Sequence, residues 1–123
     1  MRKILVVDDE EDILFSVKYG LENSSDNYEI YTANDGIKCL DVINRDIPDL
    51  ILLDLMMPNM NGWKVLDKIQ ENPIWRDIPI FIVTAAVDPE FRIYADELGI
   101  TYIEKPFDIK FLKNRIDNFF DKK

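Results

Sequence analysis

Short runs of apolar residues alternate along the chain with longer segments in which apolar residues recur every three or four positions. The short runs are typical of β-strands and lie at residues 3–7, 28–33, 49–54, 78–84 and 101–106. The longer segments between and after them carry the spacing of amphipathic helices, the last of which starts near Asp108. This alternation predicts an α/β domain in a (βα)5 arrangement around a parallel sheet.

Turn-forming residues separate the predicted elements. Asp35-Gly36 breaks the second strand from the second helix, and Gly99 is placed to end the fourth helix. The pattern contains no linker, repeat or low-complexity segment, so we expect residues 1–123 to form a single domain.

Composition restricts the class of protein. The chain is 47% hydrophobic and 32% charged, which is typical of a globular protein, and no apolar run approaches the roughly 20 residues of a membrane span. A single cysteine, Cys39, rules out an internal disulfide, so we expect a cytoplasmic protein with no membrane contact. The net charge of −9 argues against direct nucleic-acid binding. The absence of histidine excludes histidine-based zinc sites, catalysis by Ser-His or Cys-His pairs, and a role as a phosphohistidine carrier.

Polar residues stand where the predicted strands end. Asp8 and Asp9 follow the first strand, Asp54 ends the apolar third strand, and Thr84 and Lys105 end the fourth and fifth. A carboxylate inside an apolar run is costly unless it is paired or binds a metal. Ligands of open α/β sheets bind at the carboxyl ends of the strands, so we expect these residues to form one site.

The charges of these residues suggest what the site binds. Three carboxylates about 5 Å apart repel by roughly 3 kcal/mol per pair, and Lys105 offsets one charge of the three. Oxygen ligands with a residual charge near −2 suit Mg²⁺, with Mn²⁺ as the alternative. A hydroxyl and an ammonium suit added phosphoryl oxygens, and an aspartate can itself form an aspartyl-phosphate.

Four sequence segments carry a family resemblance: "VVDDEED", "LILLDLMMPNMNGW", "IVTAA" and "YIEKPFD". Together, in this order and spacing, they resemble the receiver domain of two-component response regulators, of the stand-alone chemotaxis-regulator type. The resemblance extends from Lys3 to about Phe120. It implies a flavodoxin-like, doubly wound sheet with strand order 2-1-3-4-5.

The resemblance also implies roles for the acidic residues. Asp54 matches the aspartate that accepts a phosphoryl group from the phosphohistidine of a sensor histidine kinase or a histidine phosphotransfer protein. Asp9 matches the direct Mg²⁺ ligand, and Asp8 matches its neighbour, which often acts through water. The third protein ligand implied is the backbone carbonyl of Met56.

The remaining roles concern the phosphoryl group and the switch. Thr84 and the backbone N–H of Ala85 are implied to hold phosphoryl oxygens, and Lys105 to pair first with the acceptor and then with the phosphate. Tyr102 matches the aromatic that turns inward as Thr84 moves. These movements remodel the face of helix four, strand five and helix five, which binds a downstream target.

Three positions depart from the family pattern. Met56 and Ala86 flank the path of attacking water in the family, and neither orients water by hydrogen bonding, which predicts slow dephosphorylation. Phe111 points away from the apolar arc of the last helix and is a candidate partner contact, unless it packs against helix four.

Other functions fit the sequence less well. A haloacid-dehalogenase-type phosphatase needs a second acid where Met56 stands, and a flavin or nucleotide carrier needs a glycine-rich loop after the first strand. The main alternative is a pseudo-receiver that is never phosphorylated and binds a protein constitutively. We expect a phosphorylation-controlled switch and not an enzyme beyond weak self-phosphorylation and self-dephosphorylation, either monomeric or weakly dimeric when phosphorylated.

Overall fold

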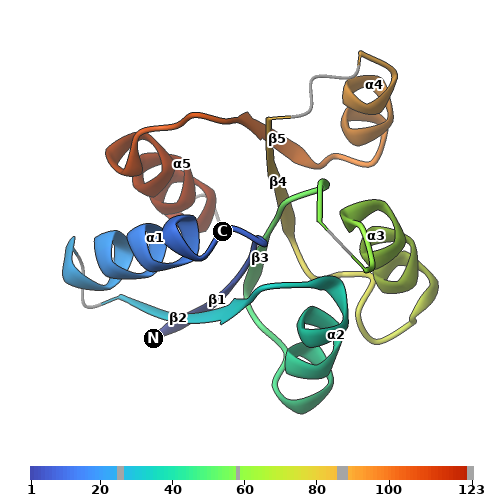
Figure 1. Ribbon diagram of the computed structural model, residues 1–123, viewed down its shortest axis with the longest axis horizontal. Coiled ribbons are helices and arrows are strands. Elements are labelled where there is room, and N and C mark those ends of the chain that lie inside the picture. The colour runs from blue at the N-terminus through green and yellow to red at the C-terminus, as the bar shows by residue number, and fades with distance from the viewer. Residues whose placement is uncertain (25–26, 58, 86–88, 122–123) are drawn as a thin grey trace.

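The computed structural model describes residues 1–24, 27–57, 59–85 and 89–121. Among these residues, five strands form one parallel sheet in the order β2-β1-β3-β4-β5 (Figure 1). The strands are β1 (Arg2–Val7), β2 (Tyr28–Ala33), β3 (Leu50–Leu53), β4 (Ile80–Thr84) and β5 (Thr101–Glu104). The sheet confirms both the predicted α/β class and the strand order that the family resemblance implied.

Helices cover both faces of the sheet (Figure 1). Within the described residues they are α1 (Glu11–Ser24), α2 (Gly36–Arg45), α3 (Gly62–Glu71), α4 (Pro89–Glu97) and α5 (Ile109–Asp121). Leu14 and Val17 of α1 and Leu112 of α5 join a core on one face of the sheet. Leu66 of α3 and Phe91 of α4 belong to the core on the other face, which α2 also covers. The central strands are therefore buried on both sides, as their continuous apolar sequences predict.

Three strands are shorter than predicted, and the fifth of the sheet ends at Glu104 and not at residue 106. The fourth strand begins at Ile80 and not at residue 78, because Pro79 has no N–H to donate to a sheet ladder. The third strand ends at Leu53, so Asp54 lies one residue beyond it. Its amide nevertheless donates to the carbonyl of Val7, 3.0 Å away, which continues the ladder with β1. The polar side chain thus leaves the strand at a position that the sheet still fixes.

Side chains in the loops before α2 and α3 cap the first turns of these helices. Asp35 accepts a hydrogen bond from the amide of Lys38 at the start of α2, and Asn61 does the same for Lys64 at the start of α3. Gly99 has a φ of +70°, a left-handed conformation that suits glycine after a helix. The predicted stop of the fourth helix at Gly99 is therefore confirmed.

Candidate functional site

The ends of four strands bring the predicted polar residues together. Asp8 and Asp54 each donate their backbone N–H to a carbonyl of a neighbouring strand, at 3.1 and 3.0 Å, and Lys105 donates to the carbonyl of Thr84 at 3.0 Å. The backbones are thus held by the sheet and not by flexible loops. Because these strands are parallel, β1, β3, β4 and β5 all present their carboxyl ends at the same edge of the sheet.

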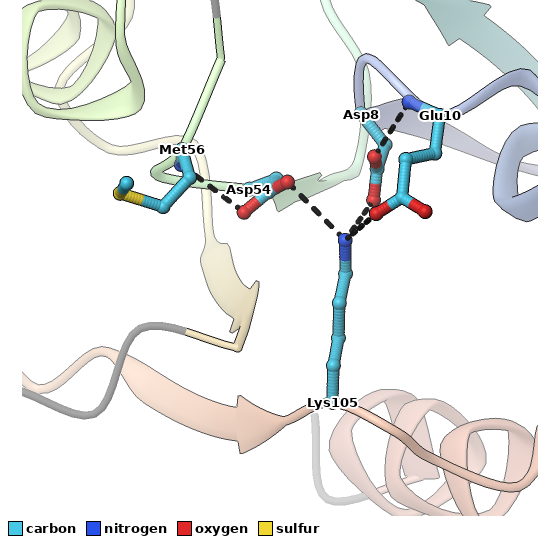
Figure 2. Close-up of polar contacts among 5 residues, drawn as sticks. All are labelled: Asp8, Glu10, Asp54, Met56 and Lys105. Atoms are coloured by element: carbon cyan, nitrogen blue, oxygen red, sulfur yellow. Dashed lines mark hydrogen bonds and ion pairs between the residues drawn. The ribbon is translucent and has the colours of Figure 1, made fainter.

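Lys105 lies at the centre of the acidic cluster (Figure 2). Its Nζ is 2.5 Å from Oδ2 of Asp8, 3.2 Å from Oδ2 of Asp54 and 3.6 Å from Oε1 of Glu10. The side chains of Asp8 and Asp54 are 4% and 5% exposed, and that of Lys105 is 10% exposed, whereas Glu10 is largely in solvent. One buried ammonium therefore connects two buried carboxylates and one at the surface.

The two buried aspartates have matching local structures. Oδ1 of Asp8 accepts the N–H of Glu10 at 2.9 Å, and Oδ1 of Asp54 accepts the N–H of Met56 at 3.2 Å. Each is an Asx turn, in which an aspartate bonds the amide two residues further along. One oxygen of each carboxylate is thereby fixed to its own loop, and the other faces Lys105 (Figure 2).

Burial and pairing act in opposite directions on these groups. Burial raises the pKa of the Asp8 carboxyl, and the hydrogen bonds from Lys105 and the Glu10 amide offset only part of this rise. Burial lowers the pKa of Lys105, but its hydrogen bond to Asp8 and the charge of Asp54 outweigh that effect and leave this pKa raised. Asp8 is thus a carboxylate whose charge the fold stabilises incompletely, a property common at functional sites.

The acidic residues also form a set of oxygen donors suited to a cation. Asp8, Asp9 and Glu10 each offer a carboxylate oxygen, and these oxygens lie within 4.8 Å of one another. Asp54 contacts the same ammonium, so these four acids and Lys105 together carry a formal charge of −3. A donor set made of oxygens with excess negative charge fits Mg²⁺.

Two features of the cluster differ from the sequence analysis. Lys105 is closer to Asp8 than to Asp54, although the family resemblance implied the acceptor as its partner. Glu10 was not predicted as a member of the site, because an exposed acid in the run "DDEED" resembles its neighbours. The signal available was its spacing, since the residue two positions after Asp8 closes the Asx turn.

The other predicted site residues lie around this cluster. Thr84 is fully buried at the end of β4, and Ala85 is exposed beside it. Met56 is at the surface, with its side chain 64% exposed, and the contact described for its backbone is the N–H on Asp54. Ala86 lies outside the described residues.

Tyr102 connects β5 to α4. It is partly buried and packs on the core, with its ring centroid 5.7 Å from that of Phe91. The guanidinium of Arg92 lies 5.0 Å from the centre of the Tyr102 ring, and Arg92 also pairs with Glu104. Phe91 in turn meets Trp63 of α3 edge-on, at 4.1 Å between centroids. A continuous set of aromatic contacts thus links α3, α4 and β5.

Phe111 lies on the outer side of α5. It is 47% exposed, and the guanidinium of Arg115, one helical turn further on, lies 5.8 Å from its ring centre. The orientation away from the apolar arc of the helix, which the sequence predicted, is therefore confirmed. Among the described residues, no aromatic ring of α4 pairs with the ring of Phe111.

Fold and site together define a flavodoxin-like α/β domain with an acidic cluster, bridged by a lysine, at the carboxyl ends of its strands. The sequence matches the family model of the response regulator receiver domain over residues 4–117. The chain therefore belongs to the receiver domain family of two-component response regulators, which confirms the resemblance seen in its sequence. A pseudo-receiver is not favoured.

Relatives of known sequence and structure agree with this assignment. A probable transcriptional regulator of Cyanophora paradoxa is 41% identical over 118 residues, which cover 94% of this chain and 46% of that protein. The N-terminal domain of a response regulator receiver protein from Methanoculleus marisnigri is 37% identical, with a TM-score of 0.78 and coverage of 96% and 95%. A CheY-like receiver domain protein from Methanospirillum hungatei is 28% identical, with a TM-score of 0.88 and coverage of 99% and 95%.

The chain spans less than half of the length of several curated relatives, at 43%, 27% and 25% of their residues. The described helices include none whose length and apolar character would let it cross a membrane.

Proposed function

We propose that this chain is a phosphorylation-controlled switch in which Asp54 accepts a phosphoryl group from the phosphohistidine of a sensor histidine kinase or a histidine phosphotransfer protein. The observation that carries this proposal is the buried Asp54 carboxylate, which shares Lys105 with Asp8. An oxygen of Asp54 forms the new bond to phosphorus as the phosphorus–nitrogen bond of the donor breaks. The donor imidazole retains the electron pair and takes up a proton.

Asp8, Asp9, Asp54 and the backbone carbonyl of Met56 would hold Mg²⁺, or Mn²⁺ in its place. The ion, when bound, supplies positive charge that lowers the repulsion between this acidic edge and an incoming phosphoryl group. Glu10 adds negative charge at the rim of the same cluster. This assignment is supported by the oxygen donors of the cluster and by the family of the chain.

The chain's own cation and hydroxyl act on the product. Lys105, which contacts both buried aspartates, pairs with the phosphoryl oxygens once Asp54 is modified. The hydroxyl of Thr84 and the N–H of Ala85, at the end of β4, hold the remaining oxygens. Thr84 moves toward the phosphoryl group, and Tyr102 turns inward in response. The face formed by α4, β5 and α5 thereby shifts its population toward a form that binds a downstream protein target.

We propose that residues 1–123 act as one receiver domain in the cytoplasm, as a monomer or a weak dimer that forms on phosphorylation. The net charge of −9 favours protein partners over direct contact with nucleic acid. The domain is a signal carrier and not an enzyme, apart from weak self-phosphorylation and self-dephosphorylation.

The first experiment measures intact mass after incubation with acetyl phosphate and Mg²⁺. The wild type should gain one phosphoryl group, and neither the wild type without Mg²⁺ nor Asp54→Asn should gain any. Asp49→Asn, which alters an aspartate at the opposite end of the same strand, is the matched control and should be phosphorylated normally. Absence of a mass gain despite measurable Mg²⁺ binding would favour the constitutive pseudo-receiver.

Phe111 is proposed as a contact for the partner protein. The ring of Phe111 is exposed and the guanidinium of Arg115 lies 5.8 Å from its centre, and aromatic and arginine side chains are enriched among the anchor residues of interfaces. Phe111→Glu should weaken binding of the kinase or of the target and leave phosphorylation by acetyl phosphate unchanged. Unchanged affinity for every partner tested would contradict this role.

A further inference from the structure

The loop that carries the acceptor is packed backbone to backbone against the start of α3. This acceptor loop consists of described residues 54–57 and 59–61. A Cβ atom added to Gly62 would collide with the carbonyl oxygen of Asp54 and would lie 2.6 Å from Cα of Leu55. The N–H of Gly62 also donates to the carbonyl of Leu55 at 2.9 Å. The peptide that follows Asp54 therefore leaves no room for a methyl group, and backbone atoms cannot rotate away as a side chain can.

A second glycine from another helix abuts the same loop. Gly36 is the first residue of α2, and a Cβ atom there would lie 2.8 Å from the carbonyl oxygen of Met60 and 2.9 Å from its Cβ. It would also lie 2.7 Å from Cγ2 of Val65 in α3. The acceptor loop is thus packed against α3 and α2 at two glycines, Gly62 and Gly36, where the absence of a Cβ atom permits the close approach.

These contacts bear on the acceptor because the sheet fixes one side of it. The N–H of Asp54 is bonded to β1, so a displaced loop cannot carry this backbone along. We expect the displacement to fall on the residues after Asp54, among them Met56, whose N–H donates to Oδ1 of Asp54 at 3.2 Å. A misplacement of about 1 Å at a reacting group can cost about a hundredfold in rate.

We propose that Gly36 and Gly62 are positioning residues that set the direction of the Asp54 carboxylate and of the Met56 carbonyl. The proposal rests on the phosphoacceptor function argued above for Asp54. It assigns to a glycine of α2, which touches none of the acidic residues in the contacts described, an effect on the affinity of the site for Mg²⁺.

The chain supplies a matched control at a third tightly packed glycine. A Cβ atom added to Gly20 of α1 would lie 2.5 Å from Cγ2 of Ile109, and its two further close atoms also belong to that side chain. This contact joins α1 to α5 and does not involve the acceptor loop. Gly20→Ala therefore tests the cost of crowding a glycine without moving Met56.

The experiment compares Gly36→Ala, Gly62→Ala and Gly20→Ala with the wild type. Circular dichroism first establishes that each variant is folded under the assay conditions. Mg²⁺ alone is then titrated calorimetrically, and the amide resonance of Met56 is recorded by NMR without metal. Gly36→Ala and Gly62→Ala should bind Mg²⁺ about tenfold more weakly and shift the Met56 resonance, whereas Gly20→Ala should stay within about twofold of the wild type.

Each outcome decides the proposal. Folded Gly36→Ala with wild-type Mg²⁺ affinity and an unmoved Met56 resonance would overturn it, as would an equal loss of affinity in Gly20→Ala. If Gly62→Ala does not fold, Gly36→Ala decides alone. The phosphoacceptor function is tested separately, and it fails if the wild type takes up no phosphoryl group. In that case, a shifted Met56 amide resonance in Gly36→Ala would still support the role of this glycine in packing the loop.

Discussion

Removing the Lys105 ammonium should destabilise the protein strongly, because it leaves Asp8 and Asp54 buried without their shared cation. Lys105→Met keeps most of the volume of the side chain and deletes the charge. Removing one partner of a buried ion pair costs about 3–5 kcal/mol. Two buried carboxylates about 5 Å apart also repel by about 3 kcal/mol at an effective dielectric of about 20.

Protonation of Asp8 limits this cost. Burial already raises the pKa of Asp8, and the loss of Lys105 raises it further. Protonating an ordinary aspartate at pH 7 costs about 4 kcal/mol, so the loss at this pH cannot greatly exceed that figure if Asp8 takes up a proton instead. We expect a loss of about 3 kcal/mol in the free energy of unfolding, which a domain of typical stability survives.

The pH dependence gives the sign of the effect. A folded-state pKa above the unfolded value contributes stability that is present below the unfolded pKa and lost as pH rises through the folded pKa. The gap between Lys105→Met and the wild type should therefore shrink, by up to about 1.4 kcal/mol per pH unit, as the pH falls from 7 toward 4. Urea unfolding followed by tryptophan fluorescence, at several pH values, measures both quantities.

A surface lysine provides the control for this measurement. Lys113 pairs with Asp117 at 2.6 Å on α5, with the two side chains 24% and 31% exposed. Lys113→Met should cost less than about 1 kcal/mol, because ion pairs between residues four apart on a partly exposed helix face contribute little. A loss in Lys105→Met no larger than in this control, or one that does not change between pH 4 and pH 7, would refute the reasoning.

Three further predictions concern other parts of the molecule. Asp117→Asn should cost about 1 kcal/mol in the free energy of unfolding at pH 7. Burial raises the pKa of Asp117, but the hydrogen bonds from Lys113 and Tyr28 outweigh burial and leave this pKa lowered. The difference between the variant and the wild type in urea unfolding should therefore disappear as the pH falls through the lowered pKa. Cys39 is fully buried, which raises the pKa of its thiol to about 12, so a thiol reagent at pH 8 should label it only after unfolding; rapid labelling of the native protein would contradict this. Met56→Asn should accelerate loss of the phosphoryl group, timed by intact mass, because the apolar side chain now at this position cannot orient water; an unchanged rate would count against the hypothesis.

The sequence predicts the positions of the site residues better than their pairing. The apolar runs end at Asp8, Asp54 and Thr84, and a parallel sheet brings such strand ends to one edge. The burial of these three side chains therefore follows from the hydrophobic pattern and the sheet topology alone. Which carboxylate Lys105 approaches most closely depends on tenths of an ångström in side-chain geometry. Hydrophobic pattern does not encode this, and the two aspartates even have the same Asx turn.

The boundaries of the strands were also less predictable than their order. Residues 78 and 79 continue an apolar run, but a proline without an N–H shortens the strand that follows it. Close packing at Gly36 had no signal in the sequence beyond the turn it was expected to form. Its contact with Met60 joins residues far apart in the chain, and such contacts follow from the packed structure and not from local propensity.

The charge of the cluster explains why a lysine and a divalent cation should share its acids. Lys105 contacts the Asp8 and Asp54 carboxylates, which are also the proposed ligands of Mg²⁺, so on this proposal each cation reduces the electrostatic stabilisation left for the other. A cation that binds only the folded state stabilises it in proportion to the logarithm of its concentration over the dissociation constant. Without the competing ammonium, Lys105→Met should therefore be stabilised more by a given Mg²⁺ concentration than the wild type. An equal or smaller Mg²⁺ effect on its urea midpoint would mean that the ammonium and the ion do not draw on the same carboxylates.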